Sequence, residues 1–279
     1  MYLPPTVMNT LRIALEEDIG NGDITTNAIV PDGQKSKGLV IAKGSFVSAG
    51  IPFAMEVFTL LDPATKFRVL HPDGSRVKKG DIIAEISGST STLLSGERVS
   101  LNILQRLSGI ATLTREFVKK VHGTGTKITD TRKTTPGMRF MEKYAVRIGG
   151  GSNHRFGLSD GILIKDNHIE AAGSIRAAVE SARRVHHLLK IEVEVENLND
   201  LKEALEAKAD IVMLDNMSLN DMKEAVKIAK GKVIIEASGN MSLDTVRAVA
   251  ETGVNLISVG AITHSAPAAD ISIKIVRQT

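Results

Sequence analysis

The sequence predicts an α/β protein with a (β/α) barrel in its C-terminal part and a mostly antiparallel α+β module before it. Three observations favour this class. From about residue 127 onward, short apolar runs alternate with amphipathic ones, at roughly 20 to 30 residues per strand-plus-helix unit. Charged, polar and small residues that could form a site recur where those apolar runs end. Before residue 110 the apolar runs are instead separated by Gly and Pro turns.

The expected elements of the C-terminal part can be given by range. The strands are predicted at residues 127–131, 161–167, 190–196, 210–216, 232–239 and 255–261. The helices between the later strands are predicted at residues 174–187, 198–208, 219–230 and 243–251. This alternation is typical of a parallel sheet, either closed into a barrel or open and doubly wound.

Polar and small residues at successive strand ends favour the barrel. They are residues 130–133, Lys165, Glu194, Asp215, residues 236–239 and Gly260. The carboxyl ends of barrel strands meet at one mouth, which holds the active site in barrel enzymes. An open sheet would place ligands at a single switch point between strands.

The strand at residues 190–196 carries three acids on one face. Glu192, Glu194 and Glu196 alternate with the apolar Ile191, Val193 and Val195. In a barrel the carboxylates would point inward, where they need cationic partners or a metal. The alternative is a strand with one solvated face.

The N-terminal part is predicted to form a separate domain. A helix is predicted at residues 10–18, strands at 38–45, 66–70, 75–77 and 81–87, and a long amphipathic helix at 95–121. We therefore expect a domain of residues 1–110 and a barrel domain of residues 111–279.

Composition limits the partners. The chain has 279 residues, 42% hydrophobic and 24% charged, as in soluble globular proteins. A net charge of +3 and 3% aromatic residues argue against nucleic acid, and the absence of cysteine excludes disulfides and thiolate metal sites. The N-terminal stretch lacks the pattern of a signal peptide and no run is long enough for a membrane span, so a cytoplasmic protein is expected.

Residues 130–169 concentrate positive charge among glycines rather than along a helix face. Between Arg132 and His168 there are seven Lys or Arg and two His against three acids. The glycines at 149–151 allow close approach of the backbone to a ligand. The segment therefore indicates an anion site, although a solvated basic loop is an alternative.

Phosphate is the first anion to consider. Residues 238–240 and 260–261 are small residues that follow strands and precede expected helices, an arrangement that suits phosphate. With Glu194 and Asp215 on other strand ends, the pattern suggests a polyanionic substrate bound with Mg²⁺. Lys165 in its apolar run could instead form a Schiff base, as in barrel aldolases.

Several long motifs resemble those of the quinolinate phosphoribosyltransferase family. They are EEDIGNGDITT (16–26), GERVSLNILQRLSGIAT (96–112), the segment 130–168, EVEVEN (192–197), LDNM (214–217), EASGN (236–240) and VGAITHS (259–265). The match covers nearly the whole chain in the family's order.

This resemblance implies that quinolinate and phosphoribosyl pyrophosphate are converted, with Mg²⁺, to nicotinate mononucleotide, pyrophosphate and CO₂ in NAD synthesis. It implies an N-terminal α/β sandwich, an incomplete C-terminal (β/α) barrel, and a homodimer with shared active sites that could assemble further into a hexamer. A related ribosyltransferase acting on another acidic heterocycle remains an alternative.

The resemblance also implies roles for individual residues. Arg98 would reach quinolinate across the dimer, and Arg132, Lys133, His154, Arg155 and Lys165 would line the anion site. Glu194 and Asp215 would face the ribose and the metal, through water, and Ser238, Gly239, Gly260 and His264 would hold the 5′-phosphate. Of these residues, Lys133, Lys165, Glu194 and Asp215 are the expected catalytic ones.

Overall fold

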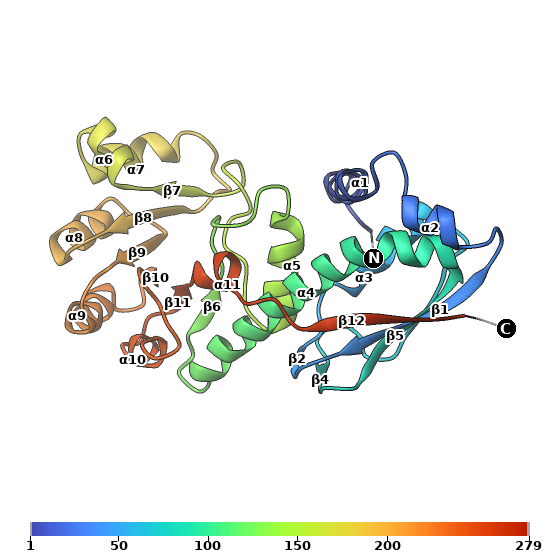
Figure 1. Cartoon of the computed structure of the whole chain (residues 1–279). Helices are drawn as coiled ribbons and strands as arrows, with labels where there is room; N and C mark the ends of the chain where they lie inside the picture. The colour runs from blue at the N-terminus through green and yellow to red at the C-terminus, as the bar shows by residue number, and fades with distance from the viewer. Residues whose placement is uncertain (1, 278–279) are drawn as a thin grey trace. The chain divides into compact units, whose positions relative to one another are not determined.

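The computed structural model describes residues 2–277, which fold into two compact units (Figure 1). The first unit takes the chain up to residue 115, residues 134–150, and the chain from residue 265. The second takes residues 116–133 and 151–264. Both compact units are therefore discontinuous in sequence, whereas the expected domains meet at a single boundary after residue 110.

An antiparallel sheet with the strand order β12-β1-β5-β3 forms the first unit. Its strands are β1 (Lys35–Ala42), β3 (Lys66–Val69), β5 (Ile82–Ser89) and β12 (Ile271–Arg277), and a smaller sheet pairs β2 (Phe46–Val47) with β4 (Arg76–Val77). Alternate residues of β1 are buried, as a strand with one face on the core requires. The antiparallel N-terminal module is thus confirmed, and β12 joins it from the far end of the chain.

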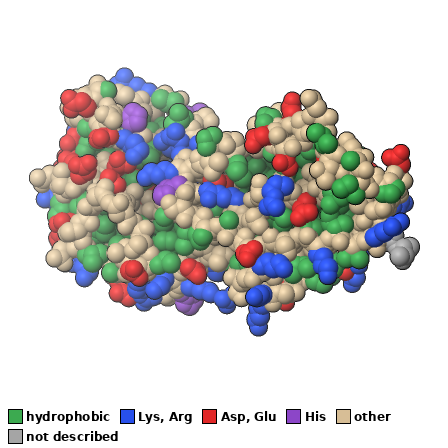
Figure 2. All heavy atoms as spheres, viewed as in Figure 1, with side chains coloured by type: hydrophobic (Ala, Val, Ile, Leu, Met, Phe, Trp, Pro, Cys, Tyr) green, Lys and Arg blue, Asp and Glu red, His purple; other side chains and the backbone are tan. Residues whose placement is uncertain are grey.

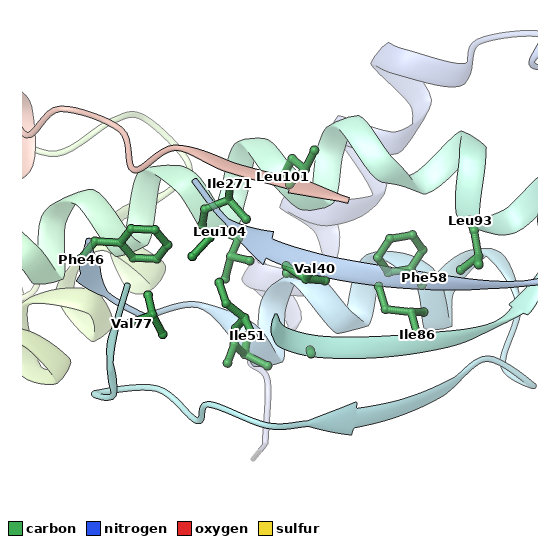
Figure 3. Close-up of a cluster of buried hydrophobic side chains, with 14 residues drawn as sticks. Val40, Phe46, Ile51, Phe58, Val77, Ile86, Leu93, Leu101, Leu104 and Ile271 are labelled. Atoms are coloured by element: carbon green, nitrogen blue, oxygen red, sulfur yellow. The ribbon is translucent and has the colours of Figure 1, made fainter. Parts of the chain in front are cut away.

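The helices of this sheet's unit are α1 (Pro5–Ile19), α2 (Ile24–Ile29), α3 (Ile51–Leu61), α4 (Thr90–Lys120) and α5 (Arg139–Gly149), although the last residues of α4 belong to the second unit. Asp23 caps α2 by accepting the backbone N–H of Thr26 at 2.9 Å. Figure 3 shows the core between α4 and the sheet, with Leu101 and Leu104 of the helix above Val40.

Helix α5 corrects the expectation that the cations of residues 130–169 avoid a helix face. It places Arg139, Lys143 and Arg147 in the first unit, and Lys143 is buried. Met141, Ala145 and Val146, which are also buried, give the helix its apolar face. None of these three cations is among the described residues that line the cavity of the second unit.

Glu142 of α5 is fully buried with a partner of opposite charge. Its Oε1 accepts hydrogen bonds from Nε and Nη2 of Arg106, at 3.1 and 2.9 Å, and from the Thr135 hydroxyl at 2.8 Å. Its Oε2 accepts the backbone N–H of Thr135 at 3.1 Å. Burial of this carboxylate is offset by these donors, and Arg106 supplies the compensating charge.

The second unit is built on a parallel sheet with the strand order β6-β11-β10-β9-β8-β7. Its strands are β6 (Lys127–Thr129), β7 (Ile162–Ile164), β8 (Ile191–Val195), β9 (Ile211–Asp215), β10 (Ile234–Ser238) and β11 (Leu256–Ser258). Strands from β7 to β11 are neighbours in chain order, and the first strand, β6, pairs with the last, β11. That order belongs to a barrel, and β6 and β7 lie at its open seam, which confirms the barrel-like fold.

Helices α6 (Asp166–Ala172), α7 (Ile175–Arg183), α8 (Leu198–Glu206), α9 (Leu219–Ala229), α10 (Val246–Ala250) and α11 (Ala261–His264) follow these strands. Figure 1 shows α7 to α10 along the outer side of the parallel strands. The side chains of Ser174, Asn197 and Ser218 cap α7, α8 and α9. None of the helices within residues 2–277 has the length and apolar character needed to cross a membrane.

Strand β8 separates the three acids that the sequence placed on one face. Glu192 is buried and Glu194 is half-buried, whereas Glu196 lies beyond the end of the strand and is exposed. The expectation of three inward carboxylates is therefore wrong for Glu196. Two carboxylates, at different depths, remain on the inner face.

Candidate active site

A cavity of about 800 Å³ lies at the carboxyl ends of the parallel strands in the second unit. The residues that line it include every expected site residue of that unit: Arg132, Lys133, His154, Arg155, Lys165, Glu194, Asp215, Ser238, Gly239, Gly260 and His264. Figure 2 shows Lys, Arg and His side chains gathered on the visible face of this unit, which lies at the left of the view. The fold thus brings together residues that are more than a hundred positions apart in sequence.

Arg98 is the one expected site residue outside this set. It lies on α4 in the first unit, where it is exposed, and it is not among the residues described as lining the cavity. A role for Arg98 in a site of the second unit therefore remains a prediction.

The cationic wall of the cavity is held by backbone contacts. Lys133 follows β6, and its carbonyl accepts a hydrogen bond from the Thr263 hydroxyl at 2.8 Å. Arg155 donates from Nη1 to the Gly161 carbonyl at 3.0 Å. Burial and the nearby Arg132 both lower the pKa of Arg155, since each disfavours its charged form. Neighbouring cations in a partly desolvated wall are arranged to attract an anion.

Two carboxylates face the same cavity. Glu194 pairs through Oε2 with the ammonium of Lys165, which follows β7. Asp215 ends β9, and its Oδ2 accepts a hydrogen bond from Asn216 Nδ2 at 2.8 Å. The cavity therefore offers carboxylate oxygens beside cations, a set of groups that could hold a polyanion together with a divalent metal ion.

The loop after β10 requires a glycine. Gly239 has φ +102°, and a Cβ there would lie 2.2 Å from Asn216 Oδ1. Asn216 in turn donates its backbone N–H to the Ser238 carbonyl at 3.0 Å. These contacts join the ends of β9 and β10 into one rigid edge of the cavity.

Small residues were predicted to lead into a helix and hold phosphate at two places, and a helix directly follows only one of them; phosphate binding at either place stays a prediction. Gly260 stands directly before α11. Residues 238–240, by contrast, do not lead straight into a helix, because α10 begins only at Val246. A turn in which Ser242 and Thr245 bond to one another separates them. Any anion held by residues 238–240 would thus be bound by loop groups rather than by a helix N-terminus.

The expected site residue His154 lies close to two buried carboxyl groups, Glu192 and Glu236, that were not predicted as site residues. His154 Nε2 is 3.0 Å from Glu192 Oε2 and 3.8 Å from Glu236 Oε1. Both carboxyl groups are buried inside the barrel. Burial first, and then the proximity of Glu192, raise the pKa of Glu236 to about 7. The signal available in the sequence was the inward position of Glu192, but its proximity to Glu236 depends on the strand order.

The raised pKa of Glu236 predicts a specific pH dependence of stability. Between its ordinary pKa of 4.5 and about 7, the folded state keeps a proton that the unfolded chain has released. The free energy of unfolding should therefore fall as pH rises through this window, by up to about 1.4 kcal/mol per pH unit from this group. Glu236→Gln does not titrate and should flatten that part of the curve in urea unfolding, while the surface variant Glu251→Gln should not. An unchanged slope in Glu236→Gln would contradict the prediction.

Five other residues of the cavity wall were missed, namely Leu163, Met213, Asn216, Met241 and Ser258, whereas Thr131, Asn240 and Ala261 lie in ranges that the sequence had singled out. Most of them adjoin an expected site residue at a strand end. Asn216 was the hardest to foresee, because its positive φ of 52° is a property of the folded loop.

Comparisons with known proteins agree with the family resemblance seen in the sequence. Models of the quinolinate phosphoribosyl transferase family match residues 23–108 (N-terminal domain) and 110–274 (C-terminal domain). A probable nicotinate-nucleotide pyrophosphorylase [carboxylating] of Bacillus subtilis is 48% identical, over 93% of this chain and 90% of its own. One from Synechocystis is 45% identical, over 99% and 95%. The crystal structure of NadC from Streptococcus pyogenes is 43% identical, with full coverage of both chains and a TM-score of 0.95.

Proposed function

Because the chain belongs to the quinolinate phosphoribosyl transferase family, we propose that it converts quinolinate and phosphoribosyl pyrophosphate to nicotinate mononucleotide, pyrophosphate and CO₂. The observation that carries this proposal is the cavity, where the cations Arg132, Lys133 and Arg155 share one space with the carboxylates Glu194 and Asp215. Both substrates are polyanions, and the bond to be broken develops positive charge on one side and negative charge on the other.

The cations bind the two substrates. The planar guanidinium groups of Arg132 and Arg155 match the carboxylates of quinolinate, each of which can accept two hydrogen bonds. Lys133 and Lys165 provide point charges for the leaving pyrophosphate. Ser238, Gly239, Gly260 and His264 hold the 5′-phosphate with small groups and an imidazole, which fixes the ribose so that its C1′ faces quinolinate.

The carboxylates act at the bond being broken. As C1′ loses pyrophosphate, the ribose becomes cation-like, and Glu194 and Asp215 stabilise that charge from nearby. The ring nitrogen of quinolinate forms the new bond to C1′ and becomes quaternary. The adjacent ring carboxylate then leaves as CO₂, its bonding electron pair stays on the ring carbon, and that carbon takes up a proton. The positive ring nitrogen stabilises the electron pair, so the chain needs no electron sink of its own.

The donor set of the cavity suits Mg²⁺. Glu194 and Asp215 offer hard oxygen ligands, and Mg²⁺ usually takes one or two carboxylates, substrate phosphates and water. When bound, directly or through water, the ion would neutralise charge on the pyrophosphate. Glu194 and Asp215 would hold it while Lys165 keeps the Glu194 carboxylate in place.

The reaction itself provides the test. Quinolinate labelled at the carboxylate next to the ring nitrogen should release CO₂ only when phosphoribosyl pyrophosphate and Mg²⁺ are both present. Nicotinate in place of quinolinate should give no nucleotide at comparable rates. If both substrates and Mg²⁺ give no CO₂ release, the proposal fails, and turnover of a different acidic heterocycle would support the related transferase instead.

We also propose that the active enzyme is a homodimer in which Arg98 of one copy serves the cavity of the other, in the cytoplasm. Arg98 is exposed on α4, as a residue offered to a second copy must be. Mixing Arg98→Ala chains with Lys133→Ala chains should restore about a quarter of wild-type activity through the one intact site of each heterodimer, given random exchange. Proven exchange of subunits without recovery would rule out shared sites.

A further inference from the structure

Two carboxyl groups lie buried beneath the cavity of the second unit. Glu192 of β8 and Glu236 of β10 are only 5% and 1% exposed. In each, the oxygen Oε1 is buried and has no hydrogen-bond partner. Neither glutamate is among the described residues that line the cavity, so a substrate need not touch them. Two buried carboxylates repel each other and lose hydration, so at least one charge must be neutralised.

A metal ion and a proton are the two candidates for that neutralisation. Ligand atoms of His154, Glu192 and Glu236 lie within 4.8 Å of one another, which is close enough for a metal. The hydrogen bonds of the His154 ring favour the proton. The backbone N–H of Arg155 donates to His154 Nδ1 at 2.8 Å, so Nδ1 is the unprotonated nitrogen and the ring proton lies on Nε2. In metal-binding histidines the second nitrogen normally donates a hydrogen bond rather than accepting one.

The two carboxyl groups differ in their surroundings. Glu192 Oε2 accepts the Nε2–H of His154 at 3.0 Å. Glu236 Oε1 is 3.8 Å from the same nitrogen and has no hydrogen-bond partner. Burial and the nearby Glu192 raise the pKa of Glu236, which favours its neutral form. Glu192 is therefore the member of the pair that holds the ring.

His154 connects this pair to the cationic wall. Its own backbone N–H donates to Asp130 Oδ1 at 2.8 Å, and its ring joins Glu192 to the backbone of Arg155. Glu192 also favours the charged form of the Arg155 guanidinium, which is partly desolvated and close to Arg132. A change at Glu192 should therefore alter the position of Arg155 without touching the substrate.

We propose that Glu192 is a positioning residue of the anion site. Its Oε2 holds the His154 ring, and the ring accepts the backbone N–H of Arg155, which fixes Arg155 at the cavity wall. The nature of the anion that Arg155 meets rests on the proposed function, whereas this chain of hydrogen bonds does not.

This difference in contacts predicts that the same substitution has unequal effects at the two glutamates. Glu236→Gln keeps the shape of a side chain that does not bond to the His154 ring, so kcat and KM should stay within about threefold of wild type. Glu192→Gln replaces the acceptor of the His154 Nε2–H by an amide and weakens the hydrogen bond that orients His154 and Arg155, so kcat should fall about tenfold. Binding of inorganic pyrophosphate to Glu192→Gln, measured by calorimetry, should be unchanged or tighter, because the wall has lost a negative neighbour. Glu251→Gln on the surface is the control.

Nuclear magnetic resonance of full-length protein with ¹⁵N-labelled histidine tests the arrangement without turnover. The His154 signal, identified by its loss in His154→Gln, should show an unprotonated Nδ1 and a protonated Nε2 in wild type and in Glu236→Gln. It should shift in Glu192→Gln. The protonated nitrogen of His154 can be measured even if quinolinate is not the substrate. If a variant does not fold, the spectrum of the wild-type protein alone tests the proposed arrangement.

Three outcomes would overturn the proposal. One is a protonated Nδ1 in wild-type His154. Another is equal effects of the two substitutions on kcat, whether both are silent or both are damaging. The third is one equivalent of divalent metal in the purified protein that Glu236→Gln loses together with activity, which would make the cluster a metal site.

Discussion

Replacing Lys165 with methionine is expected to lower kcat/KM by about 100- to 1000-fold, the usual cost of removing a charge-stabilising group from an active site. The substitution removes a cation from the cavity and leaves the Glu194 carboxylate without its ion-pair partner. Steady-state assays of CO₂ release measure the loss. Lys227→Met, which removes an exposed lysine paired with Glu224 on α9, is the matched control and should have no effect.

Lys165→Arg separates the two roles that sequence reasoning left open for this lysine. If the positive charge matters, arginine should restore activity to within about tenfold of wild type. If the amine forms a Schiff base, arginine should be as inactive as methionine, and borohydride should trap a carbonyl substrate on the wild-type enzyme.

Arg106→Met is expected to cost about 3–5 kcal/mol of unfolding free energy, the largest stability effect of any single change considered. The substitution leaves the buried Glu142 carboxylate without the guanidinium that donates two hydrogen bonds to it. Urea unfolding of the full chain measures this loss. Arg176→Met is the control, because Arg176 and its partner Glu206 are both exposed and such pairs contribute at most about 1 kcal/mol.

A double substitution tests whether the loss comes from the uncompensated charge. Arg106→Met combined with Glu142→Leu should recover much of the stability, since an apolar pair in a buried position can replace an ion pair at little cost. If the double variant is less stable than Arg106→Met alone, the cost arises from packing and the electrostatic explanation is wrong.

Local patterns were enough to predict the barrel and most of its cavity. The strand β8 was foreseen from the alternation of its apolar and acidic residues, and Asp215 and Lys165 from their places at strand ends. Each of these inferences needs only neighbouring residues and the convergence of parallel strands. The family resemblance added the reaction and individual roles, which no pattern of periodicity contains.

Features that depend on distant parts of the chain were not predicted. Helix α5 was hidden because its cations lie among loop glycines, although Met141, Ala145 and Val146 have helical spacing. The proximity of Glu192 to Glu236 required the order of β8, β9 and β10. Strand β12 was missed because its partner β1 lies more than two hundred residues earlier.

That pairing of β12 with β1 has a consequence for protein synthesis. Ser36 lies opposite Arg277, so one side of β1 stays unpaired while the whole barrel is being translated. The unpaired edge of β1 could meanwhile pair with a strand of another chain. A folding unit can be completed during synthesis only after all of its segments have left the ribosome. The barrel unit can therefore fold first, and the earliest-made sheet is among the last parts of the chain to be completed.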